Sequence, residues 1–163
     1  KGKKLSKKRN HVNRFKREYP NYRFERVTEE NIDEVITFYQ EYVLKQPIDE
    51  EIYEEYERYA VLEFLNNFSR FDVVGGVLYV DDRVIGMSFG ELIGEIVFVP
   101  IEKADMNYLG SYQILAKKFA GLFEDQAPHL INREEDMGDA GLRKAKRSYY
   151  PLKVAQKYLF VGK

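Results

Sequence analysis

The segment VVGGVLYVDDRVIGMSFGELIGEIVFVPIEKAD, residues 73–105, decides the fold, because β-type patterning is strongest there. Its first two runs, 73–80 and 83–93, are rich in β-branched and aromatic residues and flank the turn pair Asp81–Asp82, which predicts a hairpin. The run 94–105 predicts a third strand. Pro100 within that run has no N–H for a strand ladder and so marks an edge or a bulge. We therefore expect three consecutive strands at the centre of the chain.

Upstream of this segment, the pattern predicts one strand and two helices. Alternation over 21–27 indicates a strand. Thr28 is the expected N-cap of the helix that follows, and Pro47 ends that helix. A second helix is predicted at about 50–70. The apolar residues that recur every three or four positions in the two helices are Ile32, Val35, Ile36, Tyr39 and Val43, then Ile52, Tyr56, Tyr59 and Leu62.

Downstream, the pattern predicts a helix after Gly110, a strand at 129–133, a helix at 140–149 and a last strand at about 155–161. The apolar face of the first of these helices is Leu115, Ala116, Phe119, Leu122 and Phe123. The resulting order, β-α-α-β-β-β-α-β-α-β, predicts an α/β fold with a mixed sheet. An extra basic helix over 3–18 precedes it.

The composition is that of one globular domain. The chain has 163 residues, of which 44% are hydrophobic and 33% charged. It has no cysteine, which excludes disulfides and thiolate chemistry and suits a reducing compartment. No apolar run reaches membrane-spanning length, and we expect a cytoplasmic protein. The chain starts with lysine, which suggests a piece cut from a longer protein.

Charge is distributed in blocks. Residues 1–20 hold nine Lys or Arg against one acid, whereas residues 28–72 hold thirteen acids against three bases. Two interpretations of 1–20 remain open: a basic linker helix before a domain at 21–163, or an RNA-binding helix with Phe15 and Tyr19 available for stacking. The candidate nucleic-acid contacts are Lys7, Lys8, Arg9 and Arg14.

Two common kinds of site are not supported by the sequence. GMSFG, residues 86–90, matches the G-x-S-x-G nucleophile motif, but Ser88 falls in the middle of a predicted strand rather than at a strand-to-helix turn. These glycines are better explained by close backbone approach within a sheet. Metal ligation is not expected either, because the chain has two histidines far apart in sequence and no cysteine.

The junction EKADMNYLGSY, residues 102–112, joins a bulged strand to a helix through a glycine, an arrangement that offers backbone N–H groups to an anion. Together with the strand order, it resembles the GNAT acyltransferase fold, in which a loop R/Q-x-x-G-x-G/A wraps the pyrophosphate of coenzyme A. Only Gly110 of that pattern is present, because Asn107 and Tyr112 replace the other two conserved positions. We therefore expect neither coenzyme A nor another cofactor. Candidate substrate-binding residues here are Tyr108, Gly110, Tyr112 and Gln113.

Several motifs taken together, among them KKLSKKRNHVNRFKREYP, FGELIG and NREEDMGDAGLRKAKRSYYP, resemble one bacterial family. Its members carry a domain like the C-terminal domain of phosphatidylglycerol lysyltransferase, and most have two GNAT-like halves. The resemblance covers the whole chain, which corresponds to the second half plus the basic helix between the halves. It implies aminoacyl transfer from a charged tRNA, with the missing N-terminal half as partner.

The stretch Asn132–Asp136 follows an apolar strand and precedes a cationic helix. Acids at the end of a strand and cations on the next helix suit a ligand site, since open α/β sheets bind ligands there. The alternative is a brace that fastens the strand to the helix. Candidate catalytic residues are Glu102, Glu135 and Asp136. Further candidate substrate-binding residues are Asn132, Arg133, Glu134, Lys144, Lys146, Arg147 and Tyr149.

The function predicted from these features is acyl or aminoacyl transfer, with aminoacyl-tRNA as the implied donor. A module of the same fold that binds or assembles without chemistry remains the alternative. Acyl transfer from an ester needs positioning, a proton acceptor and donors for the oxyanion, which these residues can supply.

Overall fold

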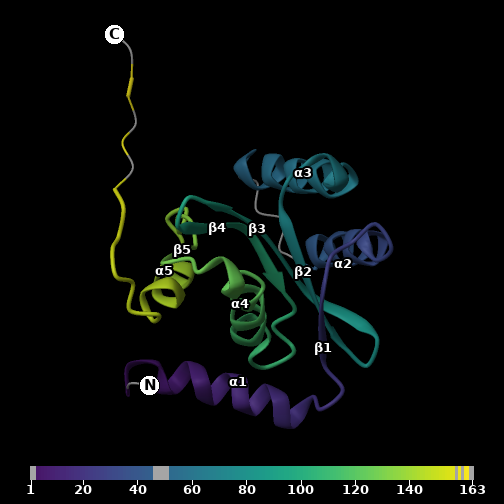
Figure 1. Ribbon diagram of the computed structural model, residues 1–163. Helices are drawn as coiled ribbons and strands as arrows, with labels where there is room; N and C mark the ends of the chain where they lie inside the picture. Colours follow the sequence, from purple (N-terminus) through teal and green to yellow (C-terminus); the bar gives the residue numbers. More distant parts are fainter. Residues whose placement is uncertain (1–2, 46–51, 157, 159, 162–163) are drawn as a thin grey trace.

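The structure is a computed structural model that describes residues 3–45, 52–156, 158 and 160–161. Its centre is a five-stranded sheet in the order β1-β2-β3-β4-β5 (Figure 1). The strands are β1 (Arg23–Arg26), β2 (Val74–Val80), β3 (Arg83–Ile93), β4 (Ile96–Ala104) and β5 (Leu130–Asn132). Neighbouring strands are antiparallel except β4 and β5, which are parallel. The predicted mixed sheet is confirmed.

The β2–β3 hairpin forms at the predicted turn. Asp81 and Asp82 both have positive φ, 48° and 63°, as a two-residue turn that matches the twist of the strands requires. Ser88 lies in the middle of β3 and is fully buried, so no nucleophile elbow exists there. The glycine interpretation is confirmed at Gly90, where a Cβ atom would lie 2.2 Å from the Phe98 carbonyl oxygen.

Helices cover both faces of the sheet (Figure 1). On one face lie α2 (Ile32–Leu44) and α3 (Ile52–Asn66); on the other lie α1 (Ser6–Glu18) and α4 (Ser111–Gly121). Alternate residues of β2 enter the two cores: Val77 and Tyr79 pack under α2 and α3, whereas Leu78 packs with the α1 residues Val12 and Phe15. Phe15 is fully buried, so the basic helix packs into the same core as the sheet.

Pro100 marks a bulge, as predicted. The β3–β4 register shifts between the pairs Phe89–Ile101 and Glu91–Phe98. Before the bulge, Val97 and Val99 pack with Phe119 of α4. After it, the residue parity is reversed, so Lys103 forms an ion pair with Glu57 of α3 and Glu102 turns toward the α1 and α4 side. The bulge therefore sets which face receives Glu102.

The β4–β5 pairing is short. Only Ile96–Phe98 pair with Leu130–Asn132, whereas β4 continues to Ala104. The chain after β5 instead turns into α5 (Ala140–Arg147), whose N-cap Asp139 accepts a hydrogen bond from the Leu142 N–H. We call the region beyond the last β4–β5 pair, between Glu102 and Arg133, the β4–β5 split.

Thr28 caps the start of α2, as predicted. Its hydroxyl accepts a hydrogen bond from the Glu30 N–H, its carbonyl accepts one from the Ile32 N–H, and its own N–H donates to the Asn31 side chain.

Several predicted boundaries were wrong. The regular helix α2 begins at Ile32, one turn after Thr28. The helices also end earlier than predicted, at Asn66, Gly121 and Arg147. Short 3-10 helices occur at Lys3–Leu5, Phe68–Arg70 and Glu124–Gln126. The start of the predicted 50–70 helix and Pro47 lie partly or wholly outside the described residues.

The predicted last strand, 155–161, was also wrong. Its described residues form no strand, and Tyr158 and Phe160 are 73% and 92% exposed. An alternating pattern indicates an extended backbone, but a strand also needs a neighbour to pair with. No described strand lies beside this segment, which extends away from the sheet in Figure 1.

Candidate active site at the β4–β5 split

Glu102 is the buried acid of the split. Its side chain is 11% exposed and lies at a level where β4 is paired with β3 but no longer with β5. Burial raises the pKa of Glu102, while the nearby Arg133 charge and hydrogen bond oppose that rise. A carboxyl with a raised pKa at an open sheet edge is a candidate proton acceptor.

Arg133 closes the split. It is the first residue after β5, and its Nη2 donates a hydrogen bond to Glu102 Oε1. The Arg133 side chain is 28% exposed, so the ion pair lies at the edge of the interior rather than in open solvent. The guanidinium also lies 4.7 Å from the ring centroid of Tyr149, just beyond α5. Arg133 thus links β4, β5 and the end of α5.

Lys146 of α5 holds the segment after β5. Its Nζ donates to the carbonyl oxygens of Arg133 at 2.5 Å and Glu134 at 3.1 Å, and also to that of Glu135. Three successive carbonyls can converge because Glu134 has a positive φ of 55°. Burial, followed by repulsion from Arg133, lowers the pKa of Lys146. One ammonium therefore fixes the backbone that carries Arg133.

Asp136 acts as a second anchor for α5. Its carboxylate accepts hydrogen bonds from Arg143 Nε at 2.7 Å, Arg143 Nη2 at 2.9 Å and the Gly138 N–H at 3.1 Å. The Arg143 hydrogen bond is the largest influence that lowers the pKa of Asp136 to about 2. This two-pronged pairing is the geometry of a brace, as in the structural alternative for Asn132–Asp136.

Lys8 brings α1 to the split. Its Nζ lies 4.1 Å from the Tyr149 ring centroid, so Lys8 and Arg133 both contact one aromatic ring. Burial and then the positive charge of Arg133 lower the pKa of Lys8. The structure therefore assembles Glu102, Arg133, Lys146, Tyr149 and Lys8 from four separate segments of the chain.

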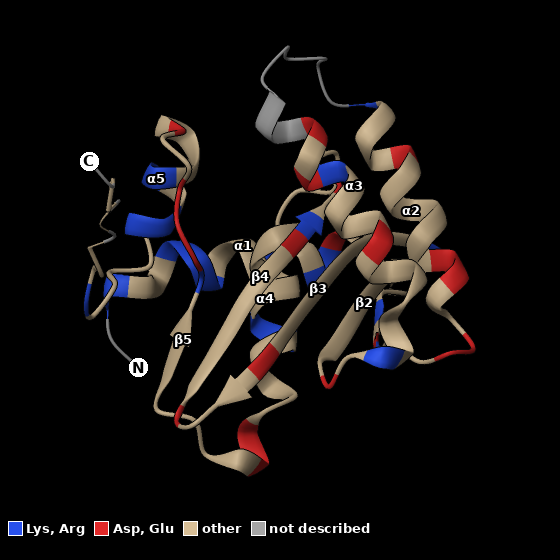
Figure 2. Ribbon diagram, turned by 90° about the horizontal axis from the view of Figure 1, so that it is seen from above, with Lys and Arg blue, Asp and Glu red and all other residues tan. Residues whose placement is uncertain are grey.

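Other predicted residues lie around this group. Asn132 accepts a hydrogen bond from the Glu134 N–H at 2.8 Å, which shapes the turn after β5. Lys144 and Arg147 are exposed on α5, as are Lys7 and Arg9 on α1. Figure 2 shows Lys and Arg positions, in blue, along α5. Arg14 is paired with Glu18 at 2.6 Å. Glu135 is exposed, and its carbonyl accepts a hydrogen bond from Lys146.

The glycine junction before α4 is covered by α1. Gly110 has a φ of +93°, and a Cβ added there would lie 2.7 Å from the His11 carbonyl oxygen. Several N–H groups of the junction are already bonded within it: Asn107 to Asp105 Oδ1, Tyr108 to the Asp105 carbonyl and Ser111 to the Tyr108 carbonyl. Of the other candidates here, Tyr108 packs on Tyr19, Tyr112 is half-buried against the core on the α1 side, and Gln113 is half-buried.

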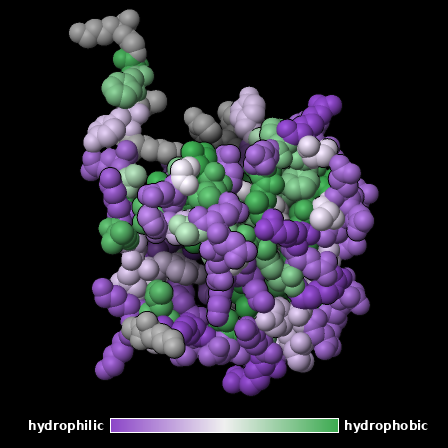
Figure 3. All heavy atoms as spheres, in the orientation of Figure 1, coloured by the Kyte–Doolittle hydropathy of each residue, from purple (hydrophilic) through white to green (hydrophobic). Residues whose placement is uncertain are grey.

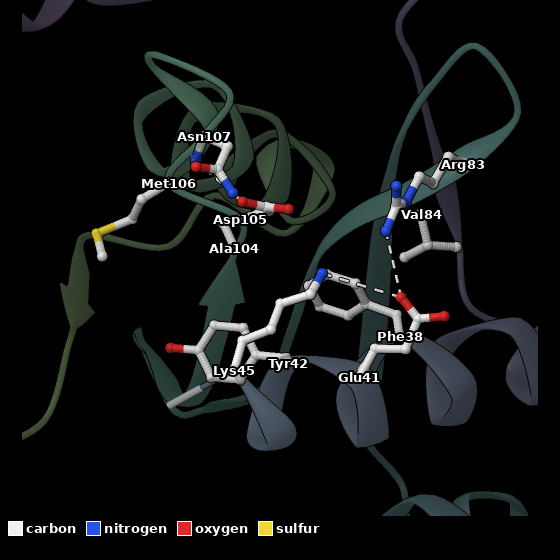
Figure 4. A pocket seen from close by; sticks show the side chains of 10 residues that line it. All are labelled: Phe38, Glu41, Tyr42, Lys45, Arg83, Val84, Ala104, Asp105, Met106 and Asn107. Atoms are coloured by element: carbon white, nitrogen blue, oxygen red, sulfur yellow. Dashed lines mark hydrogen bonds and ion pairs between the residues drawn. The ribbon is translucent and has the colours of Figure 1, made fainter. Parts of the chain in front are cut away.

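A cleft of about 320 Å³ opens between α2, the start of β3 and the end of β4 (Figure 4). Phe38 and Tyr42 of α2 line it together with Val84 and the segment Ala104–Asn107. At its rim, Glu41 lies between Arg83 and Lys45, at 3.2 Å and 4.0 Å. Apart from the junction segment 104–107, the lining of this cleft was not predicted from the sequence. The reason is that the pattern of α2 is that of an ordinary amphipathic helix.

Two general features of the described part of the chain bear on function. Its His, Asp and Glu side chains form no group of three that could hold a metal ion. None of its helices is long and apolar enough to cross a membrane.

Comparison with known proteins places the fold. The structure resembles a conserved protein of unknown function from Bacteroides thetaiotaomicron, with a TM-score of 0.88 and 38% identity over 94% of this chain and 52% of that one. It also resembles an aminoglycoside acetyltransferase from a soil metagenome, with a TM-score of 0.61 and 14% identity over 88% and 97% of the two chains. A ribosomal-protein-alanine N-acetyltransferase from Brucella melitensis matches with a TM-score of 0.60 and 10% identity, over 86% and 99%. The GNAT acetyltransferase fold is thereby confirmed.

A relative in sequence is an uncharacterized protein of Mycoplasmoides gallisepticum, 26% identical over 97% of this chain and 51% of the relative. The chain thus spans about half the length of this relative and of the Bacteroides protein. The model of the family "Phosphatidylglycerol lysyltransferase, C-terminal" matches residues 1–161. The chain therefore belongs to the family defined by the C-terminal domain of phosphatidylglycerol lysyltransferase.

Proposed function

We propose that this domain catalyses acyl or aminoacyl transfer at the β4–β5 split, with Glu102 as the proton acceptor. The observation that carries the proposal is the largely buried carboxylate of Glu102, held by Arg133 where β4 is no longer paired with β5. Family membership and the fold shared with acetyltransferases support the same reaction class.

In the proposed step, an amine or hydroxyl of the acceptor attacks the acyl carbonyl of the donor ester. The bond between the acyl carbon and the donor oxygen breaks, the acceptor's proton passes to Glu102, and the donor oxygen leaves as a hydroxyl after taking up a proton. Arg133 keeps Glu102 oriented, and its remaining N–H groups suit the oxyanion that forms during the attack. Glu135 and Asp136 are less suited to the catalytic role, since Glu135 is exposed and Asp136 is fixed by Arg143.

We further propose aminoacyl-tRNA as the donor. The 3-10 helix Lys3–Leu5 and α1 present exposed cations at Lys3, Lys4, Lys7 and Arg9, and α5 adds Lys144 and Arg147. Hydrophilic residues dominate the edge of the molecule where α1 lies (Figure 3). Several exposed cations on helices that meet at the Lys8–Tyr149 contact suit a chain of phosphates. The missing N-terminal half, implied by the length of the relatives, is the proposed partner that completes the acceptor site.

Coenzyme A is not the proposed donor. A pyrophosphate needs free N–H groups and bare backbone at the N-terminus of α4. α1 covers Gly110 instead, and three N–H groups of the junction are bonded internally. Calorimetry with acetyl-coenzyme A should therefore detect no micromolar binding, and a micromolar dissociation constant would overturn this assignment.

The test of the proposed function is a comparison of Glu102→Gln with Glu91→Gln in the full-length protein. Glu91 is an exposed carboxylate on the neighbouring strand β3 and serves as the matched control. Release of labelled amino acids from a mixture of aminoacyl-tRNAs should fall by about 10²–10⁴ in Glu102→Gln and stay unchanged in Glu91→Gln.

Equal transfer in both variants would overturn Glu102 as the proton acceptor, whereas no transfer by the wild-type protein would support the alternative, a module that binds without chemistry. The feature that favours that alternative is the ion pair itself, because a carboxylate held only to brace a sheet has the same geometry.

A further inference from the structure

Lys8 is the charge at the split that has no acidic counterpart. Lys146 lies near Glu102, Glu134 and Asp136, all of which raise its pKa, and Arg133 is paired with Glu102. Among the described residues, Lys8 forms no ion pair, and the charged group that influences it is Arg133, another cation. A half-buried cation whose charged neighbour is a second cation is unfavourable unless an anion compensates it.

Tyr149 fixes these two cations with respect to each other. The Lys8 ammonium and the Arg133 guanidinium lie 4.1 Å and 4.7 Å from the centroid of the same ring. Each retains donors, since an ammonium has three N–H groups and a guanidinium has five. A tetrahedral oxyanion, which accepts charge-assisted hydrogen bonds of about 2.8 Å on several sides, has the size and charge to contact both.

We propose that Lys8 and Arg133, positioned by Tyr149, form a binding site for one phosphate group of a polynucleotide. A phosphate of a polynucleotide fits better than a single carboxylate because the elements that carry the site also carry further exposed cations: Lys4 just before α1, Lys7 on α1, and Lys144 and Arg147 on α5. The Glu102 carboxylate accepts a hydrogen bond from Arg133 and repels a second anion. The phosphate is therefore expected at the N–H groups of Arg133 that do not face Glu102.

This inference deepens the proposed function, because it names where the donor's phosphate binds. It also changes the role of α1. The helix is then part of a ligand site, in which Lys8 is preorganised by an aromatic ring, rather than a generally basic surface. A preorganised cation is expected to matter far more for binding than an equally charged but exposed residue of the same helix.

The test is titration of the protein with adenosine 5′-monophosphate, followed by ³¹P NMR, for wild type, Lys8→Met and Lys16→Met. Methionine keeps the aliphatic contact with Tyr149, and Lys16 is an exposed cation on the same helix. Lys8→Met should weaken binding about tenfold, Lys16→Met by less than twofold, and Lys8→Arg should restore most of the affinity. Thermal melts of each variant check that the fold is intact.

Equal losses in Lys8→Met and Lys16→Met would overturn the site in favour of general electrostatic attraction. So would the absence of detectable binding to wild type at millimolar ligand. Acetate that competes as well as inorganic phosphate would overturn the choice of phosphate, and glycerol 3-phosphate that binds much more tightly than the nucleotide would overturn the choice of a polynucleotide. Because this readout needs no transfer, its failure is distinct from a failure of Glu102→Gln to reduce activity.

Discussion

Arg133 donates a hydrogen bond to Glu102 at the level of the sheet where β4 has already lost β5 as its partner. The ion pair therefore replaces strand pairing as the link between the two segments. Both side chains are largely withdrawn from water, and each would be left uncompensated without the other.

Removal of the guanidinium should destabilise the domain. In Arg133→Met, the buried Glu102 carboxylate loses its partner, and the free energy of unfolding should fall by about 3 kcal/mol. Urea denaturation at pH 7 measures the loss. The double variant Arg133→Met/Glu102→Gln should recover much of it, because no charge is then buried without a partner; no recovery would show that Arg133 stabilises by other contacts.

The stability of Arg133→Met should also depend on pH, and the sign of this dependence follows from the pKa of Glu102. Burial raises the pKa of Glu102 in the folded state, and loss of Arg133 removes the opposing effect. Between the ordinary glutamate pKa and the raised one, the folded state binds more protons than the unfolded state, so stability falls as pH rises. Arg133→Met should therefore lose stability relative to the double variant between pH 5 and pH 8. Parallel curves for the two proteins would contradict this.

The contribution of Asp136 to stability should depend on pH with the opposite sign. The Arg143 hydrogen bonds lower its folded-state pKa to about 2, below the ordinary aspartate value of 3.8. Its contribution is present at neutral pH and is lost as pH falls from about 4 toward 2. The melting temperatures of wild type and Asp136→Asn should differ most near pH 6 and converge near pH 2. A difference that is constant over this range would show that the pair does not titrate with folding.

Lys146 and Lys144 provide a matched pair on α5. Loss of the Lys146 ammonium leaves the carbonyl oxygens of residues 133–135 without their common donor. Lys146→Met should lower the free energy of unfolding by about 1–3 kcal/mol, whereas the exposed Lys144 replaced by Met should change it by less than about 0.5 kcal/mol. Denaturant melts of both variants check this. Similar values for the two would mean that the carbonyls find other partners.

The sequence predicted those parts of the fold that depend on local patterns. The hairpin turn at Asp81–Asp82 and the bulge at Pro100 follow from the conformational limits of a few neighbouring residues. The strand at 155–161 was wrong because its pattern specifies an extended backbone without specifying a neighbour to pair with. The burial of Phe15 was equally hidden, since two apolar residues on a highly charged helix give little signal.

The candidate site was predicted in composition but not in arrangement. Glu102, Arg133, Lys146 and Tyr149 were all candidates. The signal was the charge at the end of the run 94–105, at the end of the run 129–133 and on the helix predicted after it. Sequence spacing could not show that Lys146 bonds backbone carbonyls, because this depends on the left-handed conformation of Glu134. It also could not show that Lys8 meets Tyr149, since the two residues lie near opposite ends of the chain and only the packing of α1 brings them together.

Alanine substitutions at Gly110 and Gly94 can separate the stability cost of the contact with α1 from the cost of a left-handed backbone. Gly110 and Gly94 both have positive φ, but a Cβ at Gly110 meets the His11 carbonyl at 2.7 Å, whereas a Cβ at Gly94 meets nothing within 4 Å. Gly94→Ala should therefore cost only the strain of the left-handed backbone, about 1 kcal/mol. Gly110→Ala should cost that strain plus about 1–3 kcal/mol for overpacking against α1.

Limited trypsin digestion shows whether the overpacking in Gly110→Ala displaces α1. If α1 covers the junction, Gly110→Ala should displace the helix and speed cleavage at its Lys and Arg residues, while Gly94→Ala should digest like wild type. Identical digestion of the two variants would show that α1 does not rest on Gly110. In that case Gly110 would be open to a ligand, and only the internal hydrogen bonds of Asn107, Tyr108 and Ser111 would disfavour coenzyme A as donor.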